Sequence, residues 1–396
     1  MLGKWLQWQC SEALNAITCG IILPDGTYIK KPENGQPTLR FSSWKPVLRL
    51  PFQPSVALGE AYANGNMTIQ DGDLYDALNA LITAEGPIYS SLPFHLATLL
   101  RQAFLFRKDG RRKAQSAHNI HVHYDLGNAF YRLFLDEDMQ YSCGYFADPD
   151  ISLQEGQIAK KTHIANKLCL TGHSSVLDIG CGWGGMGLTL ARDYGAAVTG
   201  ITLSREQLNI AQARALAEPA LKVHFSCRDY RDESHTYDRI VSVGMFEHVG
   251  KKQFPCYFDT IDRLLKDDGV AVIHTIGSTK ASSGSDPFIS KYIFPGGYIP
   301  KLSEIMSTIE QTQLRVTDIE VWHDHYARTL RHWRNRFMAR RDEALAMFDE
   351  RFCRLLEFYL TSCELAFSHS SLVVYQIQLC KSKGIIPITR DYLYSE

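Results

Sequence analysis

The chain has 396 residues, a length that suits two domains, because a single hydrophobic core stops growing at about 250–300 residues. Its 45% hydrophobic and 21% charged residues are typical of a folded globular protein, and a formal net charge of -1 gives no overall field that would attract nucleic acid. No run approaches the roughly 18 consecutive apolar residues of a membrane span.

The N-terminus and the cysteines indicate a cellular compartment. Gln7 and Gln9 interrupt the first apolar residues, so the N-terminus lacks the apolar core of a signal peptide. The 10 cysteines include no CxxC pair, which favours reduced thiols over disulfides or a zinc site. We therefore expect a cytoplasmic protein that reaches any membrane lipid from the inner face of the membrane.

The first part of the chain mixes strand and helix signals. The runs LPDGTYI (Leu23–Ile29) and RFSSWKPVLRL (Arg40–Leu50) predict β segments bounded by glycine and proline. Residues 74–83 and 92–106 predict two helices. This combination indicates a small α+β domain.

A basic segment marks the expected domain boundary. Residues 107–113 are polar, mostly basic and interrupted by Gly110, as is typical of an exposed linker. We place an N-terminal domain at residues 1–106, a linker at 107–118 and a second domain at 119–396.

From about Ser174 onward, apolar runs alternate with helical segments, which is the pattern of a parallel α/β sheet. The expected strands are SVLDIG, AAVTGIT, LKVHFSC, YDRIVSVGM, GVAVIHTI, LRVTDIEVW and SLVVYQIQL. A long helical insertion, rich in aromatic and basic residues, separates the last two strands from about His325 to Phe367.

A glycine-rich loop follows the first of these strands and predicts a ligand site. It reads DIGCGWGG (Asp178–Gly185), and its small residues allow the backbone and the next helix N-terminus to approach an anionic group. The GxGxG spacing differs from the GxGxxG of nicotinamide-binding folds. The second strand also ends in Thr202, not in the acidic residue that would hold the ribose of NAD.

This loop resembles the first motif of class I S-adenosylmethionine-dependent methyltransferases. The resemblance implies a Rossmann-like, mixed seven-stranded sheet with helices on both faces, a helical insertion before the last strand, and S-adenosylmethionine as co-substrate. It implies these cofactor-binding residues: Tyr141, Ser142, Asp178, Gly180, Gly182, Gly184, Thr202, Gln207, Arg228 and Asp229. Two of them have structural alternatives, because Gln207 completes a capping box with Ser204 and Asp229 also suits a surface turn.

Six further motifs narrow the resemblance. They are HVHYDLGNAFY (121–131), MQYSCGYF (139–146), MFEHVG (245–250), VIHTIG (272–277), KYIFPGGYIP (291–300) and HYARTLRHW (325–333). Together they resemble the cyclopropane fatty acid (cyclopropane-fatty-acyl-phospholipid) synthase family, which also contains the mycolic acid methyltransferases. The N-terminal run LGEAYANGNMTIQDGDLYDAL (Leu58–Leu78) favours a phospholipid synthase over the mycolic branch.

The resemblance implies a specific reaction. A methylene group from S-adenosylmethionine is added across the cis double bond of an unsaturated acyl chain in membrane phospholipid, through a carbocation that loses a proton. Bound bicarbonate is the implied base, in a pocket that matches Cys143, Glu247, His274, Ile276 and Tyr326. Taken singly, His274 also suits a core position, Cys143 a small buried hydrophobe and Tyr326 a packing role.

Other candidates carry less weight. Cys363, in FYLTSCELAF, matches a further cysteine of the family and is a weak catalytic candidate, because transfer to an alkene needs no covalent enzyme intermediate. We expect no metal site at His118, His121 and His123, because a divalent ion has no task in this chemistry.

The expected partners follow from the same resemblance. The basic linker and the arginines between residues 328 and 341 suit phospholipid headgroups, although solvated helix faces explain them equally well. We expect peripheral membrane association, a lipid-docking or dimerisation role for the N-terminal domain, a homodimer, and no nucleic-acid partner. The alternatives are a sibling enzyme that makes methyl-branched lipid and, from another class, a small-molecule methyltransferase.

Overall fold

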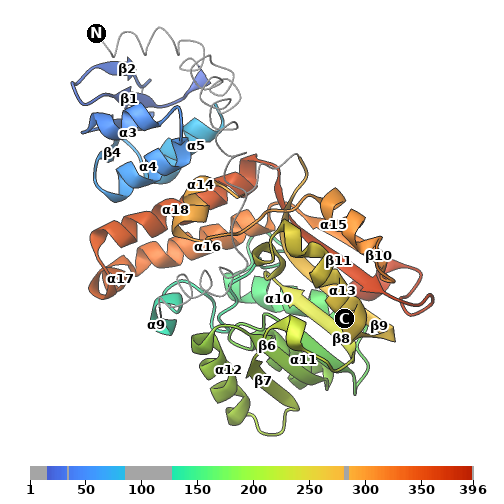
Figure 1. The fold of residues 1–396 in the computed structure, drawn as a ribbon. Coiled ribbons are helices and arrows are strands. Elements are labelled where there is room, and N and C mark those ends of the chain that lie inside the picture. The colour runs from blue at the N-terminus through green and yellow to red at the C-terminus, as the bar shows by residue number, and fades with distance from the viewer. Residues whose placement is uncertain (1–15, 34, 85–126, 281–284, 395–396) are drawn as a thin grey trace. The chain divides into compact units, whose positions relative to one another are not determined.

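The computed structural model describes residues 16–33, 35–84, 127–280 and 285–394. Its residues divide into two compact units, which are described separately (Figure 1). The first unit comprises the chain up to residue 113 together with segments 286–293 and 333–370, and the second comprises the remainder.

The first unit contains a four-stranded sheet in the order β2-β1-β3-β4. Its strands are β1 (Gly20–Ile22), β2 (Tyr28–Lys30), β3 (Thr38–Phe41) and β4 (Met67–Gln70). Its N-terminal helices are α3 (Trp44–Arg49), α4 (Pro54–Ala63) and α5 (Leu74–Ile82). The predicted helix at 74–83 is confirmed, whereas the predicted helix at 92–106 and the linker lie outside the described residues.

The predicted β segment at Arg40–Leu50 is wrong beyond Phe41, because helix α3 begins three residues later. The Ser43 side chain caps this helix by accepting a hydrogen bond from the Lys45 backbone N–H at 3.4 Å. Pro46 lies in the first turn, where its missing N–H leaves no helical hydrogen bond unmade. The local cap therefore outweighed the apolar alternation from which a strand was expected.

The insertion between the last two strands is helical, as predicted. It contains α16 (His325–Ala339), α17 (Arg341–Met347) and α18 (Glu350–His369). Helix α18 packs on α4 and α5, and the short α14 (Pro287–Tyr292) packs on α4. Parts of the expected second domain thus pack with the N-terminal helices, while the proposed limits 1–106 and 119–396 stay a prediction.

A partly buried carboxylate joins α4 to α14 within the first unit. Glu60 accepts hydrogen bonds from Arg49 at 2.5 Å, Lys291 at 2.6 Å and the Tyr292 hydroxyl at 2.7 Å. These charged and hydroxyl donors hold the pKa of Glu60 at about 2, although burial alone would raise it.

The second unit confirms the mixed seven-stranded sheet, in the order β10-β11-β9-β8-β5-β6-β7. The strands are β5 (Ser175–Ile179), β6 (Ala197–Thr202), β7 (Val223–Cys227), β8 (Tyr237–Val243), β9 (Leu265–Ser278), β10 (Arg315–Trp322) and β11 (Leu372–Cys380). Strand β11 runs antiparallel to both of its neighbours, and the pairs from β9 to β7 are parallel.

Helices cover both faces of this sheet. Adjacent residues of a strand point to opposite faces, so neighbours on β5 pack against different helices. Leu177 packs in a core with α13 (Phe254–Leu264) and α15 (Leu302–Ile309), whereas Val176 packs in a second core with α10 (Leu153–Lys167) and α11 (Gly185–Tyr194). Helix α12 (Arg205–Ala217) covers a smaller cluster beside β7.

The remaining elements are short. They are α9 (Asn128–Tyr131) and the 3₁₀ turns η1 (Tyr230–Asp232), η2 (Phe246–His248), η3 (Lys251–Gln253) and η4 (Arg390–Leu393). Within the described part of the chain, no helix combines the length and apolar character that a membrane crossing requires.

Candidate active site

A cavity of about 190 Å³ lies in the second unit, where the parallel strands β5, β6, β7 and β8 reach their carboxyl ends. This edge of an α/β sheet is the usual place for a ligand. Nine of the expected cofactor residues line the cavity, namely Tyr141, Ser142, Asp178, Gly180, Gly182, Thr202, Gln207, Arg228 and Asp229.

The glycine loop after β5 forms one wall of this cavity. Gly180, Gly182 and Gly184 have positive φ angles of 82°, 56° and 83°, a conformation that other residues adopt at a cost. A Cβ atom on Gly182 would meet nothing within 4 Å, so this position faces open space. The loop therefore leaves its backbone accessible to a ligand at Gly182.

Gly184, the tenth expected cofactor residue, is not among the residues that line the cavity. A Cβ atom there would lie 2.8 Å from the Phe225 ring, so glycine is required for close packing of the α11 N-terminus against β7. The structure thus gives Gly184 a packing role that supports the shape of the loop.

Asp178 has a buried carboxyl group that is incompletely paired. Its side chain is 2% exposed, and Oδ2 has no hydrogen-bond partner among the described residues. Burial raises the pKa of Asp178 to about 7, while the charge of Lys160 and the Gly187 backbone act in the opposite direction. A ligand with a donor group would satisfy the free carboxylate oxygen.

Thr202 and Gln207 combine structural roles with their place in the cavity wall. The Ser204 hydroxyl accepts a hydrogen bond from the Gln207 backbone N–H at 3.3 Å, which caps α12. The Thr202 hydroxyl donates to Gln207 Oε1 at 3.4 Å and accepts from the Ser204 N–H at 3.2 Å. Gln207 can therefore take part in the cap of α12 and line the cofactor cavity at the same time.

Arg228 and Asp229 follow β7 and also line the cavity. Arg228 forms an ion pair with Glu233 at 2.6 Å, and Asp229 forms one with Arg231 at 2.6 Å. The Asp229 side chain additionally accepts from the Arg231 backbone N–H at 3.0 Å, so it stabilises a turn as well as facing the cavity.

Two aromatic side chains in the cavity wall were not assigned to the cofactor in advance. Trp183 is 3% exposed, and its indole N–H donates to Asn128 Oδ1 at 2.6 Å. His248 also lines the cavity, and burial lowers its pKa to about 4, which keeps the imidazole neutral. Both residues lie within motifs of the sequence, DIGCGWGG and MFEHVG, so extending the cofactor assignment to the other residues of these motifs would have included them.

A second group of polar residues lies beside this cavity, around Glu247. Met245 and His248, on either side of Glu247 in the chain, line the cavity. Glu247 Oε1 accepts a hydrogen bond from the Ile276 backbone N–H at 2.6 Å, whereas Oε2 is buried without a partner among the described residues. Burial raises the pKa of Glu247 to about 7.

His274 lies two residues before Ile276 on β9, and its imidazole is buried. Its Nδ1 lies 3.0 Å from Gln376 Nε2, and its ring meets Trp322 edge-on at a centroid distance of 5.3 Å. Burial lowers the pKa of His274 well below its usual value, so the ring is neutral at physiological pH. Gln376 and Trp322 were not foreseen, because strand residues of ordinary type carry no motif signal.

Cys143 and Tyr326 pack with Trp322 and Val374 in a small core. The Cys143 thiol donates to its neighbour, the Gly144 carbonyl, at 3.3 Å, and burial raises its pKa. Trp322 thus connects these two side chains to His274, and β9 connects His274 to the Ile276–Glu247 pair. The structure gathers all five expected bicarbonate residues in one unit.

The polar groups around Glu247 can bind bicarbonate, because Glu247 can adopt the protonation state that complements the ion. The free Oε2 atom of Glu247 can donate when the carboxyl is protonated and accept when it is not. A bicarbonate ion, which also both donates and accepts, fits such a group. The Ile276 N–H, expected to face the anion, is already used by Glu247.

Cys363 lies elsewhere, on α18 in the first unit. Burial raises the pKa of its thiol, which disfavours the thiolate that a nucleophile requires. The three histidines at 118, 121 and 123 lie outside the described residues. Among the residues that are described, no cluster of His, Cys, Asp and Glu could hold a metal ion.

Comparison with known proteins gives consistent matches. The family model of mycolic acid cyclopropane synthetase matches residues 111–377. The cyclopropane-fatty-acyl-phospholipid synthase of Escherichia coli (strain K12) is 39% identical over 336 residues, which is 84% of each chain. The tuberculostearic acid methyltransferase UfaA1 of Mycobacterium tuberculosis is 36% identical over 82% of this chain and 79% of its own length.

A solved structure has a similar fold over about two thirds of this chain. The mycolic acid cyclopropane synthase CmaA1, complexed with SAH and CTAB, aligns with a TM-score of 0.63 and 33% identity over 66% of this chain and 97% of that chain.

Proposed function

We propose, from the premise that this chain belongs to the mycolic acid cyclopropane synthetase family, that it is a cyclopropane-fatty-acyl-phospholipid synthase. It would transfer a methylene group from S-adenosylmethionine to the cis double bond of an unsaturated acyl chain in phospholipid. The observation that carries this proposal is the adjacency of the two sites. A glycine-walled cofactor cavity directly adjoins Glu247, a buried carboxyl with a free oxygen.

The cavity wall supplies the cofactor contacts in this proposal. S-adenosylmethionine supplies an electrophilic methyl group on a sulfonium. The free Asp178 oxygen can accept a hydrogen bond from the cofactor, and the Gly182 backbone lets it approach closely. Thr202, Gln207, Arg228 and Asp229 complete the expected wall beyond β6 and β7.

The Glu247 group would handle the proton that must leave. The alkene π electrons form a bond to the methyl carbon as its C–S bond breaks. Ring closure then requires removal of one methyl proton, and bicarbonate would supply the base in the pocket of Cys143, Glu247, His274, Ile276 and Tyr326, where the Ile276 N–H would have to exchange Glu247 for the ion. With a pKa near 7, Glu247 can share or pass on that proton at physiological pH.

The proposed substrate also requires access to a membrane. Exposed apolar side chains in the first unit support docking there, including Leu48 and Phe52, each 53% exposed, and Met347, 45% exposed. We propose peripheral association with the inner face of the membrane through this unit. Of the arginines at 328–341 that were expected to meet headgroups, Arg334, Arg340 and Arg341 are already paired with glutamates, so the apolar side chains carry the proposal. A homodimer belongs to the same proposal and rests on the family resemblance.

Glu247→Gln tests the proposed base site. The substitution keeps the shape of the side chain and removes the carboxylate, so turnover should fall by about 10²–10⁴-fold while cofactor affinity changes little. Removing bicarbonate by degassing should slow the native enzyme, and adding it back should restore the rate. The variant should respond much less. Near-native turnover with an unchanged bicarbonate response would mean that Glu247 is structural.

A further inference from the structure

A buried lysine on α10 contacts the wall of the cofactor cavity. Lys160 is completely buried, and its Nζ donates to Gln140 Oε1 at 2.6 Å and to the Ser142 hydroxyl at 2.8 Å. Both acceptors belong to residues that line the cavity. One helical turn earlier, Gln157 donates to the Ser142 carbonyl at 2.8 Å, so α10 holds this wall from two positions.

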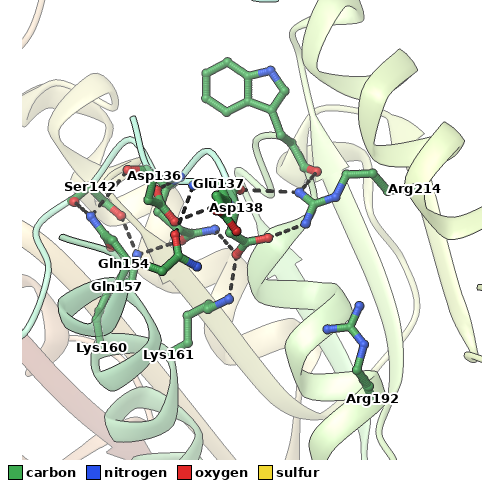
Figure 2. A network of polar contacts seen from close by, with 12 residues as sticks. Asp136, Glu137, Asp138, Ser142, Gln154, Gln157, Lys160, Lys161, Arg192 and Arg214 are labelled. Atoms are coloured by element: carbon green, nitrogen blue, oxygen red, sulfur yellow. Dashed lines mark hydrogen bonds and ion pairs between the residues drawn. The ribbon is translucent and has the colours of Figure 1, made fainter. Parts of the chain in front are cut away.

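The surrounding network pairs the neighbouring charges but leaves Lys160 with neutral acceptors. Figure 2 shows Lys160 and Lys161 reaching from α10 toward the segment that carries Asp138 and Ser142, with Arg214 of α12 approaching Asp138 from the other side. Lys161 forms an ion pair with Asp138 at 2.6 Å, and Arg214 pairs with the same carboxylate. Burial lowers the pKa of Lys160 to about 8, so the side chain carries its charge at neutral pH, and a nearby negative charge stabilises that form.

Asp178 is the incompletely paired carboxyl on the same cavity. Its Oδ2 atom has no partner among the described residues, and Lys160 is the charged side chain that favours its ionised form. Asp136 and Asp138 also act on Lys160 through their charges, but Asp138 is already held by two cations. Lys160 and Asp178 are therefore complementary: each is a buried ionisable group that forms no ion pair with the residues that the structure describes.

We propose that Lys160 is a positioning residue of the cofactor cavity, whose buried ammonium fixes Gln140 and Ser142 in the wall and keeps Asp178 in its carboxylate form. This inference rests on the cofactor cavity assigned under the proposed function. It assigns Lys160 no contact with the reacting atoms. The positive charge would act on binding through Asp178, because a carboxylate accepts a hydrogen bond from a donor group of the cofactor more strongly than the protonated acid does.

The proposal predicts how binding depends on pH. Because the pKa of Asp178 is about 7, its carboxylate is lost as pH falls below neutrality, and cofactor affinity should fall with it. Three other acidic or thiol groups around the pair are not poised to titrate near neutrality: despite burial, Lys161 and Arg214 hold the pKa of Asp138 below its usual value, and burial raises the pKa values of the Cys143 and Cys181 thiols. Burial also raises the pKa of Asp136, but this carboxyl accepts a hydrogen bond from the Gln140 backbone N–H at 2.7 Å and does not line the cavity.

Removing the Lys160 ammonium should therefore move this fall in cofactor affinity, the acid limb of the pH profile, to higher pH. An opposite charge nearby lowers a carboxyl pKa by about 1–3 units, so the limb should shift upward by about one pH unit in Lys160→Met and in Lys160→Gln. At pH 7 that shift corresponds to a roughly fivefold loss of affinity, largely recovered near pH 9, on top of any loss that is independent of pH.

The measurement is the dissociation constant of S-adenosylmethionine, determined by calorimetry on the full-length protein from pH 5.5 to 9. Lys160→Gln retains a donor for Ser142 without the charge, so it separates hydrogen bonding from electrostatics. Lys161→Met is the matched control: it removes the adjacent buried ammonium, which acts on Asp138, and should leave the limb in place. Thermal melting of each variant establishes that it is folded.

The outcomes are distinct. An upward shift of the limb in both Lys160 variants, but not in Lys161→Met, is the expected result. A loss of affinity that is equal at every pH, or an unshifted limb, would overturn the role of Lys160. Native protein without measurable affinity would instead contradict the assignment of the cavity itself.

Discussion

At the scale of single residues, the site depends on carboxyl groups that the fold buries without complete pairing. Asp178 and Glu247 each retain one buried oxygen without a partner among the described residues, and burial raises both pKa values to about 7. Burying such groups lowers the stability of the fold. A protein keeps such a carboxyl where its free oxygen binds a ligand. Glu247 provides a direct measure of that cost.

We expect Glu247→Gln to stabilise the protein at pH 8. The folded-state pKa of Glu247, about 7, lies above the ordinary value of 4.5, so the folded state holds a proton that the unfolded state releases in this interval. Stability from this group is therefore complete below about pH 4.5 and is lost as pH rises to about 7. The lost amount is on the order of 3 kcal/mol, and glutamine removes the loss.

Thermal or denaturant unfolding at pH 4 and pH 8 measures this effect. The variant should gain stability over the native protein only at the higher pH. The same difference at both pH values would mean that Glu247 is not buried as an acid.

Most residues of the candidate site could be named from the sequence because motifs place them at strand ends. Gly184 differs, since its role depends on the Phe225 ring from another strand, a contact that no local pattern records. Trp322 and Gln376 were missed for the same reason: they contact His274 only through the pairing of β9, β10 and β11.

At the scale of elements, the loop between β5 and α11 is the most constrained segment of the site. Its three positive-φ glycines turn the chain between a buried strand and a helix N-terminus. Sequence patterns predicted the flanking elements correctly, because the strand is short and mostly apolar and the helix ends at Gly195 in a left-handed cap. Helix α3 was mistaken for a strand because a short capped helix has too few residues to show a period.

Gly182→Val should weaken cofactor binding at least tenfold. A branched side chain at φ 56° costs roughly 1–3 kcal/mol in backbone strain and would extend into the open space of the cavity. Gly384→Val is a matched control, because Gly384 has a φ of 85° and equally open surroundings but lies outside the cavity wall. Calorimetry should show weakened affinity for S-adenosylmethionine only in the first variant; unchanged affinity there would refute the assignment of this loop.

At the scale of the whole molecule, the order of elements along the chain does not match their division into units. The sequence predicted a boundary near residue 107 and a second domain, 119–396, that includes the helical insertion. Helix α18 of this insertion packs on α4 and α5, a long-range contact that its own amphipathic pattern could not identify. The pattern predicted a buried face on that helix but carried no information about its partner.

A truncation that removes residues 1–106 should therefore do more than remove a docking surface. It would expose the apolar face of α18 that packs on α4 and α5, including Phe358, which contacts Tyr62. We expect a lower melting temperature and aggregation, in addition to lost activity on vesicles. A truncated protein that melts like the native chain and stays monodisperse would show that α18 needs no such cover.

The central claim is that this chain builds a cyclopropane ring on a phospholipid acyl chain. The most direct measurement is incubation with vesicles of cis-unsaturated phospholipid and S-adenosylmethionine that carries a trideuterated methyl group, followed by mass spectrometry and ozonolysis of the lipid. We predict a product that gains one methylene carbon, retains two of the three deuterium atoms and no longer reacts with ozone. Lipid without the label, or a product that keeps a double bond or all three deuterium atoms, would contradict the claim.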